Sequence, residues 1–370
     1  MSAPDLHATV AVYRVKSDAA SIEARAQGIA IEQSIEMPLE AVRDETVRRD
    51  IVARVGAIRD LGEGRFEVEI GLSHLTFSND AGQLLNMLYG NSSLQDDVEL
   101  LDFRLDPELL GFYPGSGQGV AGLRARAGAW GRALTCAAIK PQGLPPAGLA
   151  KLVEAFALGG VDYIKDDHGI ADGSFNERVS ACAQAALRAA DRTGRLTHYV
   201  PNLSGSFPVM RDQIARLRDA GLRAAMVAPV IAGLSNAQAL AQENPDLAFF
   251  AHPTMGGAAR IAPPALMKLF RLVGADAAIF PHFGGRFGYS LETCRAIAEA
   301  LRGPWPHNFS DAIPTPAGGM TPARVQEMLD FYGRDTMLLV GGVLLRAPPE
   351  RLTAEAAAFV RAVAEYGAAQ

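Results

Sequence analysis

Ionisable residues follow two short apolar runs of this chain, in the pattern expected where buried strands end. The run ALTCAAI at 133–139 is followed by Lys140, and the run VDYI at 161–164 is followed by KDDH at 165–168. Only five of the 35 basic residues are lysines, and two of those five hold these equivalent places. A lysine in a partly dry pocket has a lowered pKa, so it can act as a base, form a Schiff base or carry a carbamate. We therefore predict that Lys140 and Lys165 are catalytic rather than solvated surface charges.

The KDDH segment also has the composition of a metal site. Because alternate residues of a strand face the same way, Lys165 and Asp167 share a face, which His168 can join after the strand ends. Hard carboxylate oxygens favour Mg²⁺, whereas an imidazole admits Mn²⁺ or Zn²⁺. We predict that these three residues bind a divalent metal; the alternative is a surface loop of charges.

Two glycine pairs follow the seventh and eighth apolar runs of the chain, Gly318-Gly319 and Gly341-Gly342. Bare backbone amides can approach an anion closely. In barrels of alternating strands and helices, the loops after strands seven and eight commonly build a phosphate site. We therefore predict that these four glycines bind a phosphate group of the substrate.

Other polar residues end the remaining runs. His252 and His282 follow the fifth and sixth runs, and Asn202 follows the third. Histidine can transfer a proton near neutral pH or donate to an anion, so we predict that both histidines act on substrate. A guanidinium makes a bidentate match to a carboxylate, so we predict that Arg286 binds substrate together with Asn202. A helix-end or surface contact is the alternative role for Arg286.

The spacing of the apolar runs predicts the architecture that must position these residues. Eight runs begin 24 to 36 residues apart, and the segments between them carry apolar residues at helical spacing. The runs are 133–139, 161–164, 197–200, 223–228, 247–251, 277–280, a weak one near 308–313, and 336–340. Eight strand–helix units in about 240 residues favour an α/β fold of the (β/α)8 TIM barrel type, whose sites lie at the carboxyl ends of the strands. A doubly wound open sheet is the alternative, although the first unit lacks the GxGxxG pattern.

The first part of the chain lacks this rhythm. Alternating patterns predict strands at 7–15 and 65–73, and helical patterns occur at 19–28 and 79–90. We expect a smaller α+β, ferredoxin-like domain over residues 1–115 and the barrel over residues 116–370. The boundary falls in the segment YPGSGQG at 113–119, for which a surface loop within one domain is the alternative.

The composition is that of an ordinary globular protein, with 49% hydrophobic and 21% charged residues among 370. The net charge is −6 and the basic residues are scattered, which argues against a nucleic-acid partner. No apolar run reaches the roughly 20 residues of a membrane span. Three cysteines without a CxxC pair indicate neither a disulfide framework nor a zinc ribbon. We expect a cytoplasmic enzyme that acts on a small molecule.

Nearly the whole chain resembles the large subunit of RuBisCO. The segment AAIKPQGL resembles the first barrel strand of that family, whose pattern is TxxKPKxGL. The most specific match is GGVDYIKDDHG, which resembles the family's metal motif GGxDFxKDDE. Looser matches follow in the expected order: THYVPN, FFAHPTMGG, PHFGGRFG, PTPAGGM and LLVGGVLL. In the N-terminal region, IAIEQS and YGNSS resemble the segments that carry the family's glutamate and asparagine.

The resemblance implies a role for each matching barrel residue. Lys165 would be carbamylated by CO₂, and its carbamate would join Asp167 as a metal ligand. Lys140 would move protons during enolisation. His252 and His282 would be pocket histidines that touch substrate. Glycine donors to one phosphate would be Gly319, Gly341 and Gly342.

The resemblance also implies an assembly. Glu32 and Asn91 would match residues of the N-terminal domain that reach the active site of a partner subunit. The catalytic unit would then be a homodimer with shared active sites, in which the N-terminal domain of one chain caps the barrel of the other.

Departures from the carboxylase pattern reduce the number of activities that the resemblance allows. His168 stands where the family has a glutamate ligand, and Pro253 stands where it has an arginine. The sixth loop ends in Tyr289 instead of the mobile lysine that stabilises the CO₂-derived carboxylate. The chain is therefore identified as resembling the non-carboxylating form IV, or RuBisCO-like, branch. The lost arginine weakens a second phosphate site, so a substrate with one phosphate is expected.

These observations leave three functions open. We expect metal-dependent enediolate chemistry, and the main prediction is decarboxylation or carbon–carbon hydrolysis of a 3-oxo sugar-acid phosphate in carbohydrate catabolism. One reason for this choice is His168, because the methionine-salvage enolases keep the glutamate of KDDE at that position. The other reason is Arg286, whose guanidinium could bind the carboxylate of a sugar acid. The alternative is an enolase or isomerase of a methylthio-ketose phosphate in sulfur salvage. A catalytically silent relative with a binding or regulatory role is the second alternative.

Overall fold

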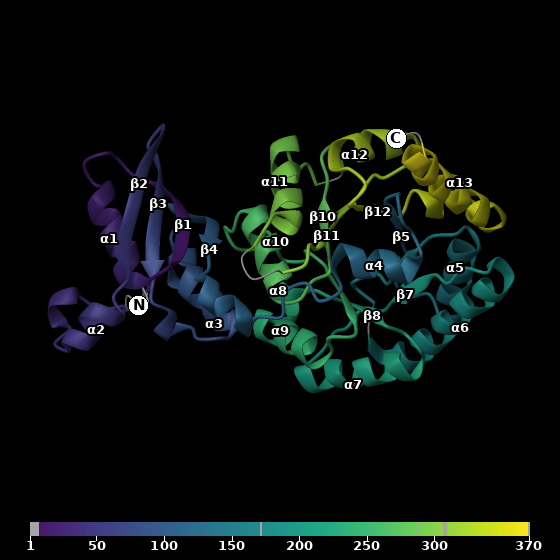
Figure 1. Ribbon diagram of the computed structural model, residues 1–370, viewed down its shortest axis with the longest axis horizontal. Helices are drawn as coiled ribbons and strands as arrows, with labels where there is room; N and C mark the ends of the chain where they lie inside the picture. The colour runs from purple at the N-terminus through teal and green to yellow at the C-terminus, as the bar shows by residue number, and fades with distance from the viewer. Residues whose placement is uncertain (1–6, 171, 286, 306–308, 369–370) are drawn as a thin grey trace.

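Two separate sheets organise the chain in the computed structural model, which describes residues 7–170, 172–285, 287–305 and 309–368. A four-stranded antiparallel sheet lies at one end of the molecule (Figure 1). An eight-stranded parallel sheet with helices around it forms the larger part. This is the combination of a barrel and a smaller α+β unit that the sequence predicts.

The antiparallel sheet has the strand order β2-β3-β1-β4. A helix lies in the chain between its first two strands and another between its last two, which gives the β-α-β-β-α-β order of a ferredoxin-like fold. Its elements are β1 (Thr9–Lys16), α1 (Ile22–Glu32), α2 (Glu45–Asp50), β2 (Arg54–Gly62), β3 (Arg65–Leu72), α3 (Ala81–Tyr89) and β4 (Val98–Arg104). The boundary predicted at residue 115 lies between η4 (Pro107–Phe112) and α4 (Gly119–Ala127), and it stays a prediction.

Alternation in the sequence located two strands that have one buried face, β1 and β3. On β3, Phe66, Val68, Ile70 and Leu72 are buried and the residues between them are partly exposed. By contrast, β2 is exposed along most of its length, so it has no hydrophobic alternation and sequence analysis did not predict it. It did not predict β4 either.

The parallel sheet closes into a barrel. Its strands follow the order β7-β6-β5-β12-β11-β10-β9-β8. They are β5 (Leu134–Ala138), β6 (Tyr163–Lys165), β7 (His198–Val200), β8 (Ala224–Val227), β9 (Ala248–Ala251), β10 (Ala277–Pro281), β11 (Ile313–Ala317) and β12 (Met337–Val340). A parallel bridge between Asn202 and Met226 joins the two end strands, with the Leu203 amide donating to the Met226 carbonyl over 2.8 Å. An open doubly wound sheet would lack this closing bridge.

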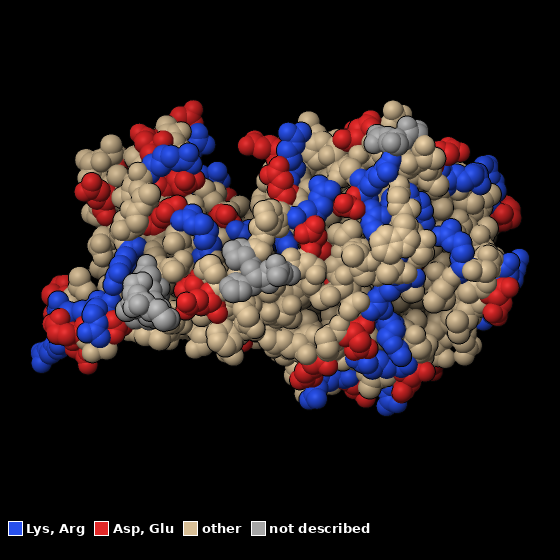
Figure 2. All heavy atoms as spheres, in the orientation of Figure 1, with Lys and Arg blue, Asp and Glu red and all other residues tan. Residues whose placement is uncertain are grey.

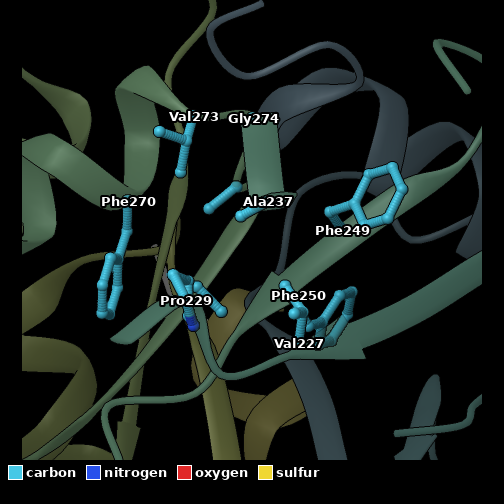
Figure 3. A pocket seen from close by; sticks show the side chains of 10 residues that line it. Val227, Pro229, Ala237, Phe249, Phe250, Phe270, Val273 and Gly274 are labelled. Atoms are coloured by element: carbon cyan, nitrogen blue, oxygen red, sulfur yellow. The ribbon is translucent and has the colours of Figure 1, made fainter. Parts of the chain in front are cut away.

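Helices surround the barrel, and its strands separate an interior core from an outer core that lies between the strands and the helices (Figure 1). They are α5 (Pro146–Leu158), α6 (Phe175–Thr193), α7 (Phe207–Asp219), α8 (Pro229–Ala232), α9 (Leu234–Glu243), α10 (Pro263–Leu272), α11 (Leu291–Arg302), α12 (Val325–Tyr332) and α13 (Pro349–Ala368). On β9, Phe250 packs in the barrel interior, whereas Phe249 packs in the outer layer. Figure 3 shows Phe249 and Phe250 on one side of a small apolar pocket, and Phe270 and Val273 on the other.

The seventh barrel strand lies later than the sequence predicts. The weak run near 308–313 led us to expect it there, but β11 begins at Ile313, and residues 306–308 lie outside the described residues. Prolines at 314 and 316 disfavour a strand, because proline cannot donate to a ladder. In this parallel pairing β11 tolerates both prolines and still pairs with β10 over its whole length.

The short helix α4 closes the end of the barrel at which the strands begin. Its Leu123 packs into the barrel interior, and the Leu123 carbonyl accepts from the Tyr163 hydroxyl over 2.8 Å. The helix is held by Asp276, a buried carboxylate next to β10 that accepts from the Gln118 and Gly119 amides over 2.6 and 2.9 Å. Asp276 also accepts from the Phe249 amide over 2.8 Å, so one side chain connects the barrel entry with two strands.

The antiparallel sheet packs against the side of the barrel, at helices α9 and α10. Lys268 on α10 donates to Asp102 Oδ1 over 2.7 Å and to the Phe103 carbonyl over 2.6 Å. Gln238 on α9 accepts from the Ala81 amide over 2.8 Å. These contacts hold the antiparallel sheet beside the barrel.

Charges of both signs are interspersed over the face of the molecule shown in Figure 2. This face has no large surface of one sign, in line with the scattered basic residues of the sequence. Among the described residues, no helix combines the length and the apolar character that a membrane span requires.

Replacement of Asp276 tests whether this carboxylate holds the barrel entry. Asp276→Ala leaves buried amides without an acceptor, so we expect the free energy of unfolding to fall by about 3 kcal/mol or more. Urea denaturation followed by circular dichroism measures the change. Asp212→Ala is the control, because that aspartate is 64% exposed and pairs with the exposed Arg216, so we expect a loss of about 1 kcal/mol or less. Equal effects of the two substitutions would contradict this account.

Candidate active site

A cavity of about 510 Å³ opens where the barrel strands end. Its wall comes from the carboxyl ends of β5, β6, β9, β10, β11 and β12 and from the loops that follow them. The predicted site residues that line it are Lys140, Lys165, His168, His252, Gly318, Gly319, Gly341 and Gly342. Segments 200 residues apart in the chain therefore supply one site, as expected for a barrel of this type.

Three successive side chains at the end of β6 point in alternating directions. Asp166 points away from the cavity and is fully buried, where it accepts from the Arg178 guanidinium. It also accepts from the Tyr199 hydroxyl over 2.5 Å and from the Asn202 amide over 2.9 Å. Because Asp166 is fixed outward, Lys165 and Asp167 share the other face, as the sequence predicts.

Lys165 is a buried amine in the wall of the cavity, only 4% exposed. Its Nζ donates to the carbonyl of Asp166 over 2.7 Å. Burial lowers the pKa of Lys165 to about 8, and the nearby charge of Lys140 acts in the same direction. An appreciable neutral fraction therefore exists near pH 8, and the neutral amine is the form that can take up a proton or react with CO₂.

Lys140 and Asp167 form an ion pair at the edge of the cavity, with Nζ 2.6 Å from Oδ2. Burial alone would raise the pKa of the Asp167 carboxyl, but the hydrogen bonds from Lys140 and Gly169, together with the charges of Lys140 and Lys165, hold this pKa below its usual value. The amide of Gly169 donates to the other oxygen, Oδ1, over 3.2 Å. Asp167 is thus an ionised carboxylate in a mostly buried place.

His168 and His252 stack on one another, with ring centroids 4.1 Å apart. The Thr254 hydroxyl lies 2.5 Å from His252 Nδ1 and 3.2 Å from His168 Nδ1. Burial lowers the pKa of both imidazoles, and for His252 burial and the Lys165 charge lower it to about 2. Both rings are therefore neutral at pH 7 and above.

The donors beside Lys165 fit a divalent metal only in part. Among the described residues, no group of three or more His, Cys, Asp and Glu side chains is placed to hold a metal ion. Asp167 Oδ1 and His168 Nε2 lie 4.0 Å apart, which two ligands about 2.0–2.2 Å from one ion can span. A third donor would come from Lys165 if it carried a carbamate. Asp167 and His168 therefore lie within reach of one ion, and binding of Mg²⁺ here stays a prediction.

The four glycines expose backbone to the cavity. Gly318 and Gly319 have φ of +91° and +76°, a conformation that side chains with a Cβ rarely adopt. A Cβ at Gly341 or Gly342 would meet no atom within 4 Å, so these positions face open space. Such a bare surface lets an anion come close to backbone amides.

Arg346 is a cavity residue that sequence analysis missed. It ends the short helix η8 (Leu344–Arg346), which follows the glycine pair at 341–342. Within the part of the chain that the structure describes, its exposed guanidinium forms no ion pair. Its place four residues after Gly342 was a signal in the sequence, but it was one among 30 arginines.

Two predicted substrate residues lie beneath the cavity wall. His282 is fully buried, with Nδ1 2.5 Å from the Phe283 carbonyl, and burial lowers its pKa. Asn202 is 4% exposed and its Nδ2 donates to the His168 carbonyl over 3.3 Å. Neither is among the residues that line the cavity. Their contact with substrate stays a prediction, and Asn202 supports the loop that carries His168.

The remaining predicted residues do not contribute to this cavity. Glu32 and Asn91 lie together in the N-terminal part, where Asn91 Nδ2 donates to Glu32 Oε1 over 2.9 Å. Their proposed reach into a partner's site stays a prediction. Arg286 lies outside the described residues.

Comparison with known proteins places the chain in a family. The model of the ribulose bisphosphate carboxylase large chain, catalytic domain, matches residues 119–362. The 5-methylthioribulose-1-phosphate isomerase of Rhodospirillum rubrum is 55% identical over 96% of this chain and 96% of its own length. A 2,3-diketo-5-methylthiopentyl-1-phosphate enolase of Geobacillus thermodenitrificans is 31% identical over 90% of this chain and 87% of that protein.

A solved structure agrees with these matches. The crystal structure of a Rubisco-like protein from Rhodopseudomonas palustris has a TM-score of 0.90 and 48% identity, and covers 97% of this chain and 98% of its own. Pro253 lines the cavity where carboxylases would place an arginine, and Tyr289 packs against the hydrophobic core instead of supplying a mobile cation. The chain belongs to the RuBisCO large-chain family, as one of its RuBisCO-like, non-carboxylating enzymes.

Proposed function

We propose that this enzyme isomerises a methylthio-ketose phosphate of the 5-methylthioribulose 1-phosphate type through an enediolate. The observation that carries the proposal is one cavity lined by Lys140, by Lys165 and by the four glycines that we propose as the phosphate site. Sequence analysis placed decarboxylation of a sugar-acid phosphate first and this reaction second. The names of the relatives, an isomerase at 55% identity and an enolase at 31%, support the second.

The cavity suits the two ends of such a substrate. Glycine amides and the Arg346 guanidinium would bind the phosphate at the ends of β11 and β12. Apolar side chains cover another part of the wall, among them Ile279 and Leu339, and would pack against the methylthio group. A site with one phosphate subsite and an apolar wall favours a monophosphate over a bisphosphate.

The lysines would carry the proton transfer. Lys165, as the neutral amine or its carbamate, would take the proton from the carbon next to the substrate carbonyl, which leaves an enediolate. Lys140 would return a proton to the neighbouring carbon, so one carbon–hydrogen bond breaks, another forms and no atom is gained or lost. The Nε2 of neutral His252 would donate to a developing oxyanion. Mg²⁺ held by Asp167, His168 and the Lys165 carbamate would supply a Lewis acid toward the carbonyl.

We also propose a homodimer in which Glu32 and Asn91 complete the site of the partner subunit. Support comes from the place of the antiparallel sheet, which packs on the side of its own barrel at α9 and α10. Neither residue lines the cavity of its own chain.

Deuterium wash-in tests the reaction. The protein, Mg²⁺ and bicarbonate are incubated in D₂O with 5-methylthioribulose 1-phosphate and, separately, with a 3-oxo sugar-acid phosphate. We expect NMR to show deuterium next to the carbonyl and formation of an isomeric ketose phosphate in the first sample only. Release of CO₂ from the second sample, without deuterium exchange in the first, would contradict this proposal and support decarboxylation of a sugar-acid phosphate.

Lys165→Met separates an enzyme from a silent binding relative. Loss of the amine removes both the base and the carbamate, so we expect kcat to fall by about 10²–10⁴-fold or more. Lys151→Met is the control, because Lys151 is an exposed residue of α5, and it should keep full activity. If the wild type bound the substrate without turnover, and Lys165→Met bound it equally well in calorimetry, the silent relative would be the correct interpretation.

Arg346→Gln tests the phosphate site. Loss of one charge-assisted hydrogen bond costs about 1.5–3 kcal/mol, so we expect KM for the phosphorylated substrate to rise about 10–100-fold with a smaller change in kcat. Arg351→Gln is the matched control, since Arg351 pairs with Glu355 on the surface of α13. An unchanged KM in Arg346→Gln would remove this residue from the site.

A further inference from the structure

A threonine that sequence analysis did not single out connects the two histidines of the cavity. The Thr254 hydroxyl oxygen lies within hydrogen-bond distance of Nδ1 of both His252 and His168, at 2.5 and 3.2 Å. The rings are stacked with 28° between their planes. Both imidazoles therefore turn the same nitrogen, Nδ1, toward one hydroxyl group.

The donors around this hydroxyl determine where its neighbours carry their protons. The backbone N–H of Thr254 donates to His252 Nδ1 over 3.2 Å, so this nitrogen is an acceptor and holds no proton. The hydroxyl, 2.5 Å from the same nitrogen, must point its single hydrogen there, since two lone pairs at that distance would repel. Only the lone pairs of the hydroxyl oxygen are left for His168, so His168 Nδ1 must be the donor.

We propose that Thr254 is a positioning residue that holds the ring proton of His168 on Nδ1 and that of His252 on Nε2. His168 Nε2, 4.0 Å from Asp167 Oδ1, then presents a lone pair beside the carboxylate. His252 presents an N–H from its own Nε2 instead. One hydroxyl thus gives two stacked imidazoles opposite roles, one as a metal ligand and one as a hydrogen-bond donor.

This inference deepens the proposed function and rests on it for the role of His168 as a ligand. The proton positions themselves are a property of the protein without metal or substrate. The proton positions can therefore be measured independently of any reaction. The role of Thr254 and the proposed isomerase function can thus be contradicted separately.

The test is NMR of the full chain with ¹⁵N-labelled histidine rings at pH 8, without metal. The chain has seven histidines, and His168→Gln and His252→Gln assign the two signals. Nitrogen shifts distinguish protonated from unprotonated ring nitrogens. In wild type we expect His168 protonated on Nδ1 and His252 on Nε2. Thr254→Val, which keeps the shape without the hydroxyl, should leave His168 in a mixture of both tautomers, and Thr254→Ser should restore the wild-type pattern.

Calorimetry with Mn²⁺ alone gives the second readout on the same variants. We expect Thr254→Val to bind Mn²⁺ about 10–100-fold more weakly than wild type, and Thr254→Ser to bind within about threefold. A wild-type His168 protonated on Nε2, or a tautomer unchanged in Thr254→Val, would overturn the inference. A shifted tautomer with unchanged Mn²⁺ affinity would uphold the role of Thr254 and remove His168 from the proposed metal site.

Discussion

The arrangement of the site depends on one buried carboxylate that points away from it. Asp166 is fully buried between α6 and β7, where the Arg178 guanidinium and the Tyr199 hydroxyl satisfy its oxygens. Removing one partner of such a buried ion pair typically costs about 3–5 kcal/mol, so the outward direction of Asp166 is strongly fixed. Because successive side chains of an extended segment alternate, Lys165 is then turned to the cavity and Asp167 to Lys140 at its edge. The chemistry of the KDDH segment therefore follows from a residue that takes no part in it.

Much of this architecture could be read from the sequence, because buried strands and amphipathic helices leave distinct patterns. Runs such as AAIF at 277–280 are apolar throughout because both faces of the strand are buried. The residues that follow such runs lie together at the end of the barrel where the strands end. Prediction failed where that link between burial and pattern is broken. In β11 two prolines stand in a paired strand, and in β2 most residues are exposed, so neither strand carries the expected pattern.

The site was less predictable, because its finer roles arise between residues far apart in the chain. Thr254 acts through His168, 86 positions earlier, and no local pattern marks a threonine for that contact. Arg346 has a local signal in the glycine pair before it, yet arginine is abundant in this chain. The position of His282 after a strand correctly predicted that it lies at the end of the barrel that holds the site. It did not predict that the side chain is fully buried, with its Nδ1 near the Phe283 carbonyl.

The Lys140–Asp167 ion pair links the two halves of the proposed chemistry. Asp167 Oδ2 is occupied by Lys140, and Oδ1 already accepts from the Gly169 amide. Lys140 must therefore leave before this carboxylate can serve a cation with both oxygens. Its side chain is 41% exposed, so water can solvate the ammonium when it leaves the carboxylate. The freed ammonium remains at the cavity, where its nearest available anion would be that of the substrate. Use of both Asp167 oxygens by a cation would therefore require release of Lys140, whereas use of Oδ1 alone, beside His168, would leave the ion pair intact.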